Sequence, residues 1–174
     1  MNEKSRKTIK ELITLFIMIL VAYALTEGIQ IAAKHALNVD MPFVVVASNS
    51  MSPTLNVGDL LIIQGVNPKE LKVGDIIIFK PPNPYWKGIP WVHRIVEIKN
   101  IGNELRFRTK GDANIYPDPF WISHKNIIGK VLYKIPYIGL VSLTLKNWTI
   151  PIIVLLIIIG IAYTLINKET EEMK

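Results

Sequence analysis

The predicted architecture rests on one segment, Val44-Val45-Val46-Ala47-Ser48-Asn49-Ser50-Met51-Ser52-Pro53-Thr54-Leu55, followed by Val57-Gly58-Asp59-Leu60. An apolar run typical of a β-strand stops in a cluster of small polar residues, and a Gly-Asp turn then starts the next apolar run. This layout holds a hydroxyl group at the edge of a sheet. Three of the six serines in the chain lie between positions 48 and 52. Serine-rich turns often only satisfy backbone groups, so the cluster alone leaves both a structural and a catalytic role open.

The segments around this turn predict a β domain. Short β-branched or aromatic runs between turn signals predict strands at 43–47, 60–64, 75–80, 91–98, 105–110 and 127–133. The runs at 57–63 and 73–79 are similar, since each begins with a Gly-Asp turn. No helix-period segment of useful length lies among the predicted strands. The expected fold is therefore mainly β, a compact antiparallel domain over residues 34–147 that stands on two membrane helices.

Apolar segments lie at both ends of the chain. The first, over 12–33, follows a basic tail over 1–11, and the second, over 148–167, precedes a tail over 168–174. Each segment is long enough to cross a bilayer as a helix, which takes about 20 residues. We therefore expect a two-span protein of the cell membrane. The basic N-terminal tail predicts that both tails are cytoplasmic and that the domain between the spans is extracytoplasmic.

The first apolar segment has one alternative reading. Thr8 and Glu11 have the spacing of a capping box, which predicts that the helix begins there. A cleaved signal peptide would also combine basic residues with a short apolar core. However, the sequence Tyr-Ala-Leu-Thr-Glu-Gly at 23–28 lacks a small-x-small cleavage site, which favours an uncleaved anchor.

The composition excludes several kinds of chemistry. The chain has no cysteine, which excludes disulfides, thiolate catalysis and Cys-ligated zinc. Its three histidines, His35, His93 and His124, lack the spacing of metal ligands, so no metal site is expected. The net charge is +6, but the lysines are scattered rather than grouped with aromatic residues, so no nucleic-acid partner is expected.

His93 is the best candidate for a base beside a serine nucleophile. Such a nucleophile needs a base that accepts its proton and a group that orients the base. Strand alternation predicts that His93, Ile95 and Glu97 share one face of the sheet. A hydrogen-bonded structural histidine remains the alternative reading. His35 and His124 are expected to be exposed.

Two aspartates could orient that base. Asp112 and Asp118 lie in turns after a predicted strand and could hold an imidazole and stabilise its charged form. Each is also a routine residue for a turn. Lys110 is the alternative base for a Ser–Lys arrangement, but acting as a base would require strong desolvation of its ammonium group.

Four segments together resemble the characteristic blocks of type I signal peptidases, family S26. They are Ser48–Leu55 with Gly58-Asp59, Val73-Gly74-Asp75-Ile76-Ile77-Ile78-Phe79, Val92-His93-Arg94-Ile95-Val96 and Thr109-Lys110-Gly111-Asp112-Ala113-Asn114. They occur in family order over residues 44–118. The bacterial branch has lysine at the base position, whereas His93 stands here, as in the archaeal and endoplasmic-reticulum branch. The chain lacks the large second β domain of longer bacterial members.

The resemblance implies a membrane-bound serine endopeptidase that removes signal peptides from secreted and membrane preproteins. Ser50 would be the nucleophile, and His93 would be the general base and then the acid. Ser48 would help the Ser50 backbone N–H to bind the oxyanion. Asp118 is favoured if a single carboxylate acts on His93, although the choice between Asp118 and Asp112 stays open.

The resemblance also implies a substrate groove and partners. Val44, Val45, Val46 and Met51 would line a groove for an extended peptide with small side chains at the first and third positions before the cut. The expected partners are signal peptides of translocated preproteins, the lipid bilayer, and accessory subunits or a translocon. The chemistry needs a nucleophile, a base and water, so no cofactor is expected.

Two other functions remain open on the sequence. One is a non-catalytic membrane module whose β domain binds an extended chain. The other is a related Ser–Lys peptidase that cleaves itself or regulates another protein, although His93 and the two predicted spans count against it. The proline- and aromatic-rich loop over 81–91 is read either as a stiff surface loop or as a segment that touches the membrane.

Overall fold

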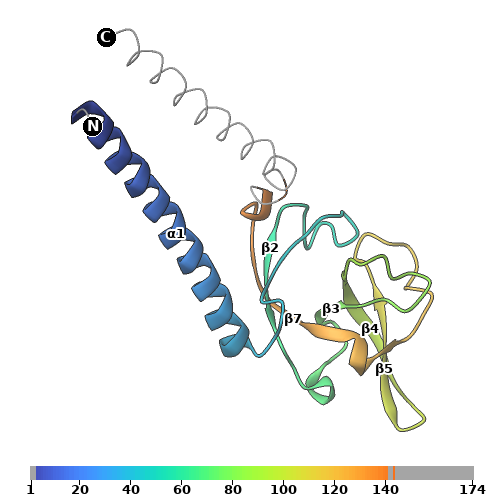
Figure 1. The fold of residues 1–174 in the computed structure, drawn as a ribbon. Coiled ribbons are helices and arrows are strands. Elements are labelled where there is room, and N and C mark those ends of the chain that lie inside the picture. Colours follow the sequence, from blue (N-terminus) through green and yellow to red (C-terminus); the bar gives the residue numbers. More distant parts are fainter. Residues whose placement is uncertain (1–2, 141–142, 144–174) are drawn as a thin grey trace.

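The structure, a computed structural model, describes residues 3–140 and residue 143. Helix α1, Glu3–Leu37, leads into a seven-stranded antiparallel sheet (Figure 1). The prediction of a mainly β antiparallel fold with an apolar N-terminal helix is therefore confirmed. The predicted second span over 148–167 and the tail over 168–174 lie outside the described residues.

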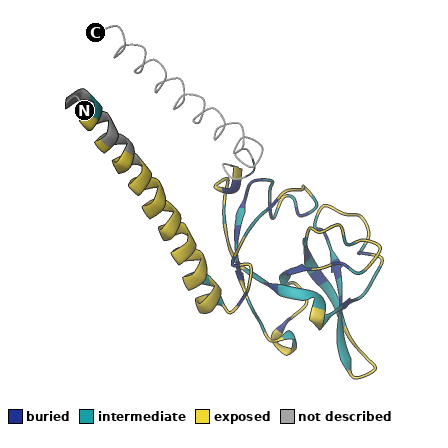
Figure 2. Cartoon of the chain, viewed as in Figure 1, coloured by how far each residue is buried: buried dark blue, intermediate teal, exposed yellow. Residues whose placement is uncertain are grey.

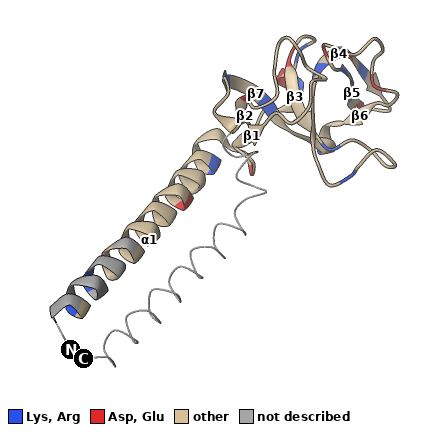
Figure 3. Cartoon of the chain, turned by 90° about the horizontal axis from the view of Figure 1, so that it is seen from above, with Lys and Arg blue, Asp and Glu red and all other residues tan. Residues whose placement is uncertain are grey.

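Helix α1 carries the apolar segment at the N-terminal end. Its part Phe16–Leu37 is 22 residues long, apolar enough to cross a membrane, and unburied. Figure 2 shows this exposure along α1, and Figure 3 shows that most of the coloured charged residues lie in the β domain. The helix begins at Glu3, so the predicted start near Thr8 is wrong, because Glu, Lys and Arg upstream are good helix formers. It ends at Leu37, and the next residue, Asn38, has a φ of 50°, which is a left-handed cap.

Seven strands form the sheet. They are β1 Phe43–Val45, β2 Leu60–Gln64, β3 Ile76–Phe79, β4 Trp91–Ile101, β5 Glu104–Lys110, β6 Ile122–Ser123 and β7 Ile127–Ile135. Two 3-10 helices, η1 Pro68–Glu70 and η2 His124–Asn126, lie in the connections. All six predicted strands form, with ends within three residues of the prediction. Strand β6 was not predicted, because two residues give no apolar run.

The sheet does not follow the order of the chain. The strand order is β1-β2-β7-β3-β4-β5-β6, and every neighbouring pair is antiparallel. Strand β7 lies between β2 and β3, pairing Tyr133 with Ile62 and Lys130 with Ile77. Strands β1 and β6 are therefore the two edges of the sheet.

A bulge in β4 changes which side chains share a face. The register between β4 and β5 shifts between Ile95 and Glu97, so one extra residue interrupts the alternation. As a result Ile98, rather than Glu97, packs with Ile95 against the core. Glu97 instead forms an ion pair with Lys99. The prediction that Glu97 shares a face with His93 and Ile95 is therefore wrong.

The buried side chains of the described residues form two clusters, and the central strand β3 contributes to both. The first consists of Val39, Val46, Met51, Leu55, Leu61, Ile63 and Ile78. The second consists of Leu71, Ile77, Phe79, Ile95, Phe107 and Ile122. The first cluster anchors the turn after β1, and the second fixes β3, β4 and β5 against one another.

The two Gly-Asp turns have the same local geometry, as their sequences predict. Gly58 and Gly74 have φ angles of +90° and +98°, which are left-handed values that favour glycine. In each turn the aspartate side chain, Asp59 or Asp75, accepts a hydrogen bond of 3.0 Å from the backbone N–H three residues upstream. Each turn thus fixes the direction in which the next strand, β2 or β3, begins.

Candidate active site

Ser50 lies in a tight turn that follows the edge strand β1. The Ser52 N–H donates to the Asn49 carbonyl at 3.0 Å, and the Leu55 N–H donates to the Met51 carbonyl at 2.9 Å. Met51 and Leu55 are 1% and 2% exposed, so the turn is anchored in the first core cluster. Ser50 itself remains partly exposed beside these buried neighbours. The Ser50 hydroxyl is therefore presented by a turn whose backbone is anchored in the core.

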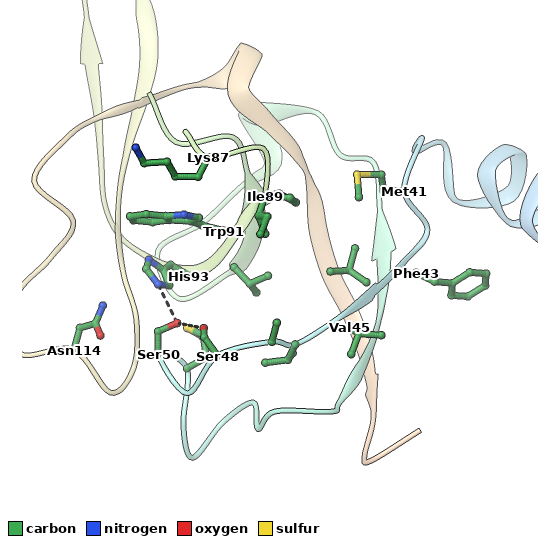
Figure 4. Close-up of a pocket in the computed structure, with 16 residues that line it drawn as sticks. Met41, Phe43, Val45, Ser48, Ser50, Lys87, Ile89, Trp91, His93 and Asn114 are labelled. Atoms are coloured by element: carbon green, nitrogen blue, oxygen red, sulfur yellow. Dashed lines mark hydrogen bonds between the residues drawn. The ribbon is translucent and has the colours of Figure 1, made fainter. Parts of the chain in front are cut away.

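His93 contacts Ser50 on one side of its ring and Asp118 on the other. The distance from Nε2 to Ser50 Oγ is 3.3 Å, and the distance from Nδ1 to Asp118 Oδ2 is 2.7 Å (Figure 4 shows the first contact). His93 and Asp118 are each 5% exposed. A carboxylate oxygen only accepts hydrogen bonds, so Nδ1 is the donor in its contact and Nε2 is left to accept from Ser50. Ser48 Oγ lies 3.3 Å from Ser50 Oγ.

The curvature of the sheet brings these residues together. Ser50 follows β1, whereas His93 lies on β4, four places along the strand order. In a flat sheet those two strands would be about 19 Å apart at the usual spacing between neighbours. The contact of 3.3 Å between Ser50 and His93 therefore requires the sheet to curl so that the β1 edge faces β4.

Aromatic rings surround the imidazole of His93. The ring centroids of Trp91 and Phe79 lie 5.5 Å and 6.2 Å from that of His93. Trp91 in turn contacts Tyr85, from the 81–91 loop, and Phe120. The loop is thus packed onto the domain next to the site. Whether it also touches a membrane stays a prediction.

Asp112 does not contact His93 but pairs with Arg94. The Arg94 Nε and one terminal nitrogen donate to the two Asp112 carboxylate oxygens at 2.9 Å and 2.6 Å. These hydrogen bonds are the main reason that the pKa of Asp112 is lowered. The positive charge of Arg94 lowers it further, and together the two effects outweigh partial burial, which raises the pKa. The same hydrogen bonding raises the pKa of Arg94. Arg94 also donates to the Gly74 carbonyl and to Thr54 Oγ1, so it links three turns around the site.

The segment after β5 holds both Ser50 and Asp118 in place. The Ala113 N–H donates to the Ser50 carbonyl at 2.9 Å, and the Asp118 N–H donates to the Thr109 carbonyl at 2.8 Å. The Thr109 hydroxyl also donates to Asp118 Oδ2 at 2.5 Å. Thr109 is fully buried. Ala113, in the turn after β5, therefore fixes the backbone of Ser50, and Thr109, near the end of β5, fixes the carboxylate of Asp118.

An apolar groove of about 740 Å³ leads away from Ser50 and His93. Its lining consists of Met41, Phe43, Val44, Val45, Val46, Ala47, Ser48, Ser50, Met51, Lys87, Ile89, Pro90, Trp91, Val92, His93 and Asn114. One wall is the β1 segment, and the other includes Lys87, Ile89 and Trp91 (Figure 4). All four residues predicted for a groove from the sequence contribute to this lining.

The remaining predicted candidates lie apart from this cluster. His35 is exposed near the end of α1, as expected, whereas His124 is half-buried in η2 beside β5, so its predicted exposure is wrong. Lys110 lies opposite Arg94 in the β4–β5 register and is absent from the described lining of the groove. Within residues 3–140, no group of three or more His, Asp or Glu side chains could hold a metal ion.

The sequence did not single out several residues of the site. Thr109 belongs to one of the four family-like segments, and its only signal in the sequence is a hydroxyl at an inward strand position. Arg94 follows His93 directly in the sequence, and that position alone predicts no role for its side chain. Trp91, Lys87 and Asn114 come from loops or strand ends, and no local pattern predicts that they line the groove.

The comparisons with known proteins agree on one family. The family model described as signal peptidase, peptidase S26, matches residues 9–99. The signal peptidase complex catalytic subunit SEC11C of Homo sapiens is 31% identical over 139 residues, which cover 75% of this chain and 70% of the relative. The catalytic subunit sec11 of Sclerotinia sclerotiorum is 31% identical over 153 residues, covering 83% and 85%. The chain therefore belongs to the type I signal peptidases of family S26, in the archaeal and endoplasmic-reticulum branch, and is a serine protease.

Proposed function

We propose that this chain cleaves signal peptides from preproteins with Ser50 as nucleophile, His93 as general base and Asp118 as the group that orients His93. The observation that carries the proposal is the position of His93, whose two ring nitrogens lie 3.3 Å from Ser50 Oγ and 2.7 Å from Asp118 Oδ2. A nucleophile, a base and an orienting carboxylate in this order are the parts of a serine protease triad. Asp112, which pairs with Arg94, has a supporting role in this scheme.

The reaction would proceed in two halves. In the first, His93 Nε2 accepts the proton of Ser50 as Oγ attacks the scissile carbonyl carbon, and a tetrahedral intermediate forms. His93 then gives that proton to the leaving amine as the C–N bond breaks, which leaves an ester on Ser50. In the second half, water attacks the ester with His93 as base, and Ser50 regains its proton. Asp118 stabilises the imidazolium in both halves.

The oxyanion would be bound by groups of the turn after β1. The Ser50 backbone N–H and the Ser48 hydroxyl lie on the same turn as the nucleophile, and Ser48 Oγ is 3.3 Å from Ser50 Oγ. A hydrogen-bond donor of this kind stabilises the transition state by about 3 kcal/mol. The loss of the Ser48 hydroxyl should therefore lower kcat about a hundredfold and leave KM nearly unchanged.

The substrate would bind as an extra strand on β1. The backbone groups of Pro42 and Val46 form hydrogen bonds toward β2. The Ile63 N–H donates to the Pro42 carbonyl, and the Val46 N–H donates to the Asp59 carbonyl. Because successive residues of a strand point their backbone groups to opposite edges, those of Phe43 and Val45 face the open side. An extended peptide paired there would run along the apolar groove toward Ser50. Its alternate side chains would face the Val44–Val46 wall.

The proposal extends to the membrane topology and the partners. We place the first span within α1, the second over 148–167, both tails in the cytoplasm, and the β domain over 34–147 outside the cell membrane. Membrane anchoring would concentrate enzyme and substrate in the same plane, which supplies part of the proximity effect. The relatives named above are subunits of a signal peptidase complex, which supports accessory subunits as further partners of this chain.

The topology can be tested with single cysteines, because the chain has none of its own. We expect a membrane-impermeant maleimide to label Asn103→Cys, at the β4–β5 turn, in intact cells. Asn2→Cys and Glu172→Cys should be labelled only after permeabilisation. Labelling of Glu172→Cys in intact cells would contradict the second span, and protection of Asn103→Cys would contradict an external β domain.

The catalytic proposal is tested by cleavage of a preprotein in detergent with added lipid. Wild type should cut after a small residue, identified from the mass of the new N-terminus, and Ser50→Ala should not cut. Ser52→Ala is the matched control, since Ser52 belongs to the same cluster but bonds to Asn56 rather than to His93. Equal cutting by wild type and Ser50→Ala would remove Ser50 from the mechanism.

A further inference from the structure

Thr109 lies behind the proposed triad, on the side of Asp118 that the substrate does not reach. It is the last inward-facing residue of β5 and is fully buried. Its hydroxyl donates to Asp118 Oδ2, which is also the oxygen 2.7 Å from His93 Nδ1. One carboxylate oxygen therefore receives hydrogen bonds from both the imidazole and the threonine.

Thr109 also holds the backbone of Asp118 in place. Asp118 lies in the connection between β5 and β6, outside any strand. Its backbone N–H donates to the Thr109 carbonyl at 2.8 Å, and its side chain accepts from the Thr109 hydroxyl. The same residue thus holds the main chain and the carboxylate of Asp118, and it does so from a strand whose register is fixed by pairing with Ile95.

The hydroxyl also suits the charge of the site. Asp118 is 5% exposed, and a buried carboxylate is costly unless hydrogen bonds replace those it made with water. A threonine hydroxyl supplies such a bond without a positive charge that would compete with the imidazolium of His93 for the carboxylate. The β-branched side chain has few rotamers, so the direction of the hydroxyl is well defined.

We propose that Thr109 is a positioning residue for proteolysis, whose hydroxyl holds Asp118 Oδ2 against His93 Nδ1. This inference rests on the proposed function, because it assigns Thr109 to the Ser50–His93–Asp118 arrangement. Thr109 has two separable properties. Its volume fills space in the core, and its hydroxyl acts through Asp118. The isosteric change Thr109→Val removes the hydroxyl and keeps the volume.

The test compares preprotein cleavage by wild type, Thr109→Val, Thr109→Ala and Thr109→Ser in the full chain. Loss of one hydrogen bond to a charged group should lower kcat about 10- to 100-fold in the Val and Ala variants, with KM within about threefold of wild type. Thr109→Ser retains the hydroxyl and should stay within about threefold of wild type. Thr109→Val and Thr109→Ala both remove the hydroxyl but differ in packing. If only one of them folds, as judged by its thermal midpoint, that variant is sufficient for the test.

A double-mutant cycle separates positioning from a general structural effect. In the Asp118→Asn background, Thr109→Val should cause no further loss of kcat, because its effect passes through the carboxylate. An equal loss in both backgrounds, or a folded Thr109→Val with kcat within threefold of wild type, would overturn the inference while leaving the proposed triad intact. Full activity of Asp118→Asn itself would overturn the proposed triad and this inference together.

Discussion

The backbone of Gly111 lies against the carbonyl oxygen of Ser50, so closely that a Cβ at position 111 would be 2.5 Å from that oxygen. The same turn donates the Ala113 N–H to this carbonyl. The turn after β5 and the turn after β1 are therefore in direct backbone contact, and glycine at position 111 permits that contact. The position of the Ser50 hydroxyl depends on a residue that carries no functional group.

Gly111→Ala should lower activity because the new methyl group displaces the backbone of Ser50. A shift of about 1 Å in a reacting group can lower the rate about a hundredfold, and we expect at least a tenfold loss of kcat. The cleavage assay measures this loss, and the thermal midpoint shows that the variant is folded. Gly28→Ala, in α1, is the matched control, since nothing lies within 4 Å of its Cβ position. Equal activity of both variants would contradict the proposed constraint.

The two aspartates should respond differently to amide substitution. Asp118→Asn should lower kcat about 10³- to 10⁴-fold, because the amide no longer provides the charge that stabilises the imidazolium of His93. Asp112→Asn should lower kcat less than about tenfold, because Asp112 bonds to Arg94 and not to His93. Steady-state cleavage of a peptide substrate measures both. A larger loss for Asp112→Asn would reverse the assignment of the two carboxylates.

The Arg94–Asp112 pair should make stability depend on pH in the acidic range. The pKa of Asp112 is lowered in the folded protein, so its carboxylate stabilises the fold above its ordinary pKa of about 4. This contribution is lost as the pH falls through the lowered value. Asp112→Asn should therefore lower the thermal midpoint at pH 7 by an amount equivalent to about 1 kcal/mol, since the pair is partly exposed. The difference from wild type should shrink below about pH 4, and a constant difference from pH 3 to pH 8 would contradict this account.

A bulky side chain in the groove should weaken substrate binding without destabilising the domain. Ala47 is exposed and lines the groove immediately before the serine turn. Ala47→Phe should lower kcat/KM for a preprotein at least about tenfold, mainly through KM, because it occupies space where an extended peptide would lie. Ile101→Phe, on the exposed β4–β5 hairpin, is the control and should cleave normally. Unchanged kcat/KM for Ala47→Phe would place the substrate elsewhere.

The second core cluster should contribute strongly to stability. Phe107 is fully buried on β5 and packs in the cluster that contains Phe79 and Ile95. Phe107→Ala should lower the free energy of unfolding by about 3–5 kcal/mol, through lost transfer free energy and a residual cavity. Phe107→Leu should cost considerably less, because it preserves most of the volume. Denaturant titration of the purified chain measures both, and equal losses would contradict the packing described.

The strands could be predicted from local patterns because each is a short apolar run that ends in a turn signal. The Gly-Asp turns at Gly58 and Gly74 gave particularly sharp boundaries for β2 and β3. The extra residue in β4 could not be predicted, because a bulge depends on the pairing of β4 with β5, which the sequence of β4 alone does not give. The start of α1 depended on summed helix propensity rather than on the capping box at Thr8.

The site could be predicted in its residue types but not in its pairings. Motif resemblance selected Ser50 and His93, and it left Asp112 and Asp118 as alternatives. The structure places Asp118 on His93 because the Asp118 N–H pairs with the carbonyl of Thr109, at the end of β5, a contact between residues nine positions apart. The contact between His93 and Asp118, and the curl that brings β1 to β4, arise from the assembled sheet and not from any single segment.

The central place of β7 in the sheet determines when, during synthesis, the two halves of the proposed site can come together. Among the described residues β7 is the last strand along the chain, yet it joins the half of the sheet that carries Ser50 to the half that carries His93. A ribosome that has released only the first six strands has made Ser50 and His93 but not the element that brings them together. The proposed site can therefore form only after Ile127–Ile135 has been synthesised, so the order of the strands along the chain sets when activity can begin.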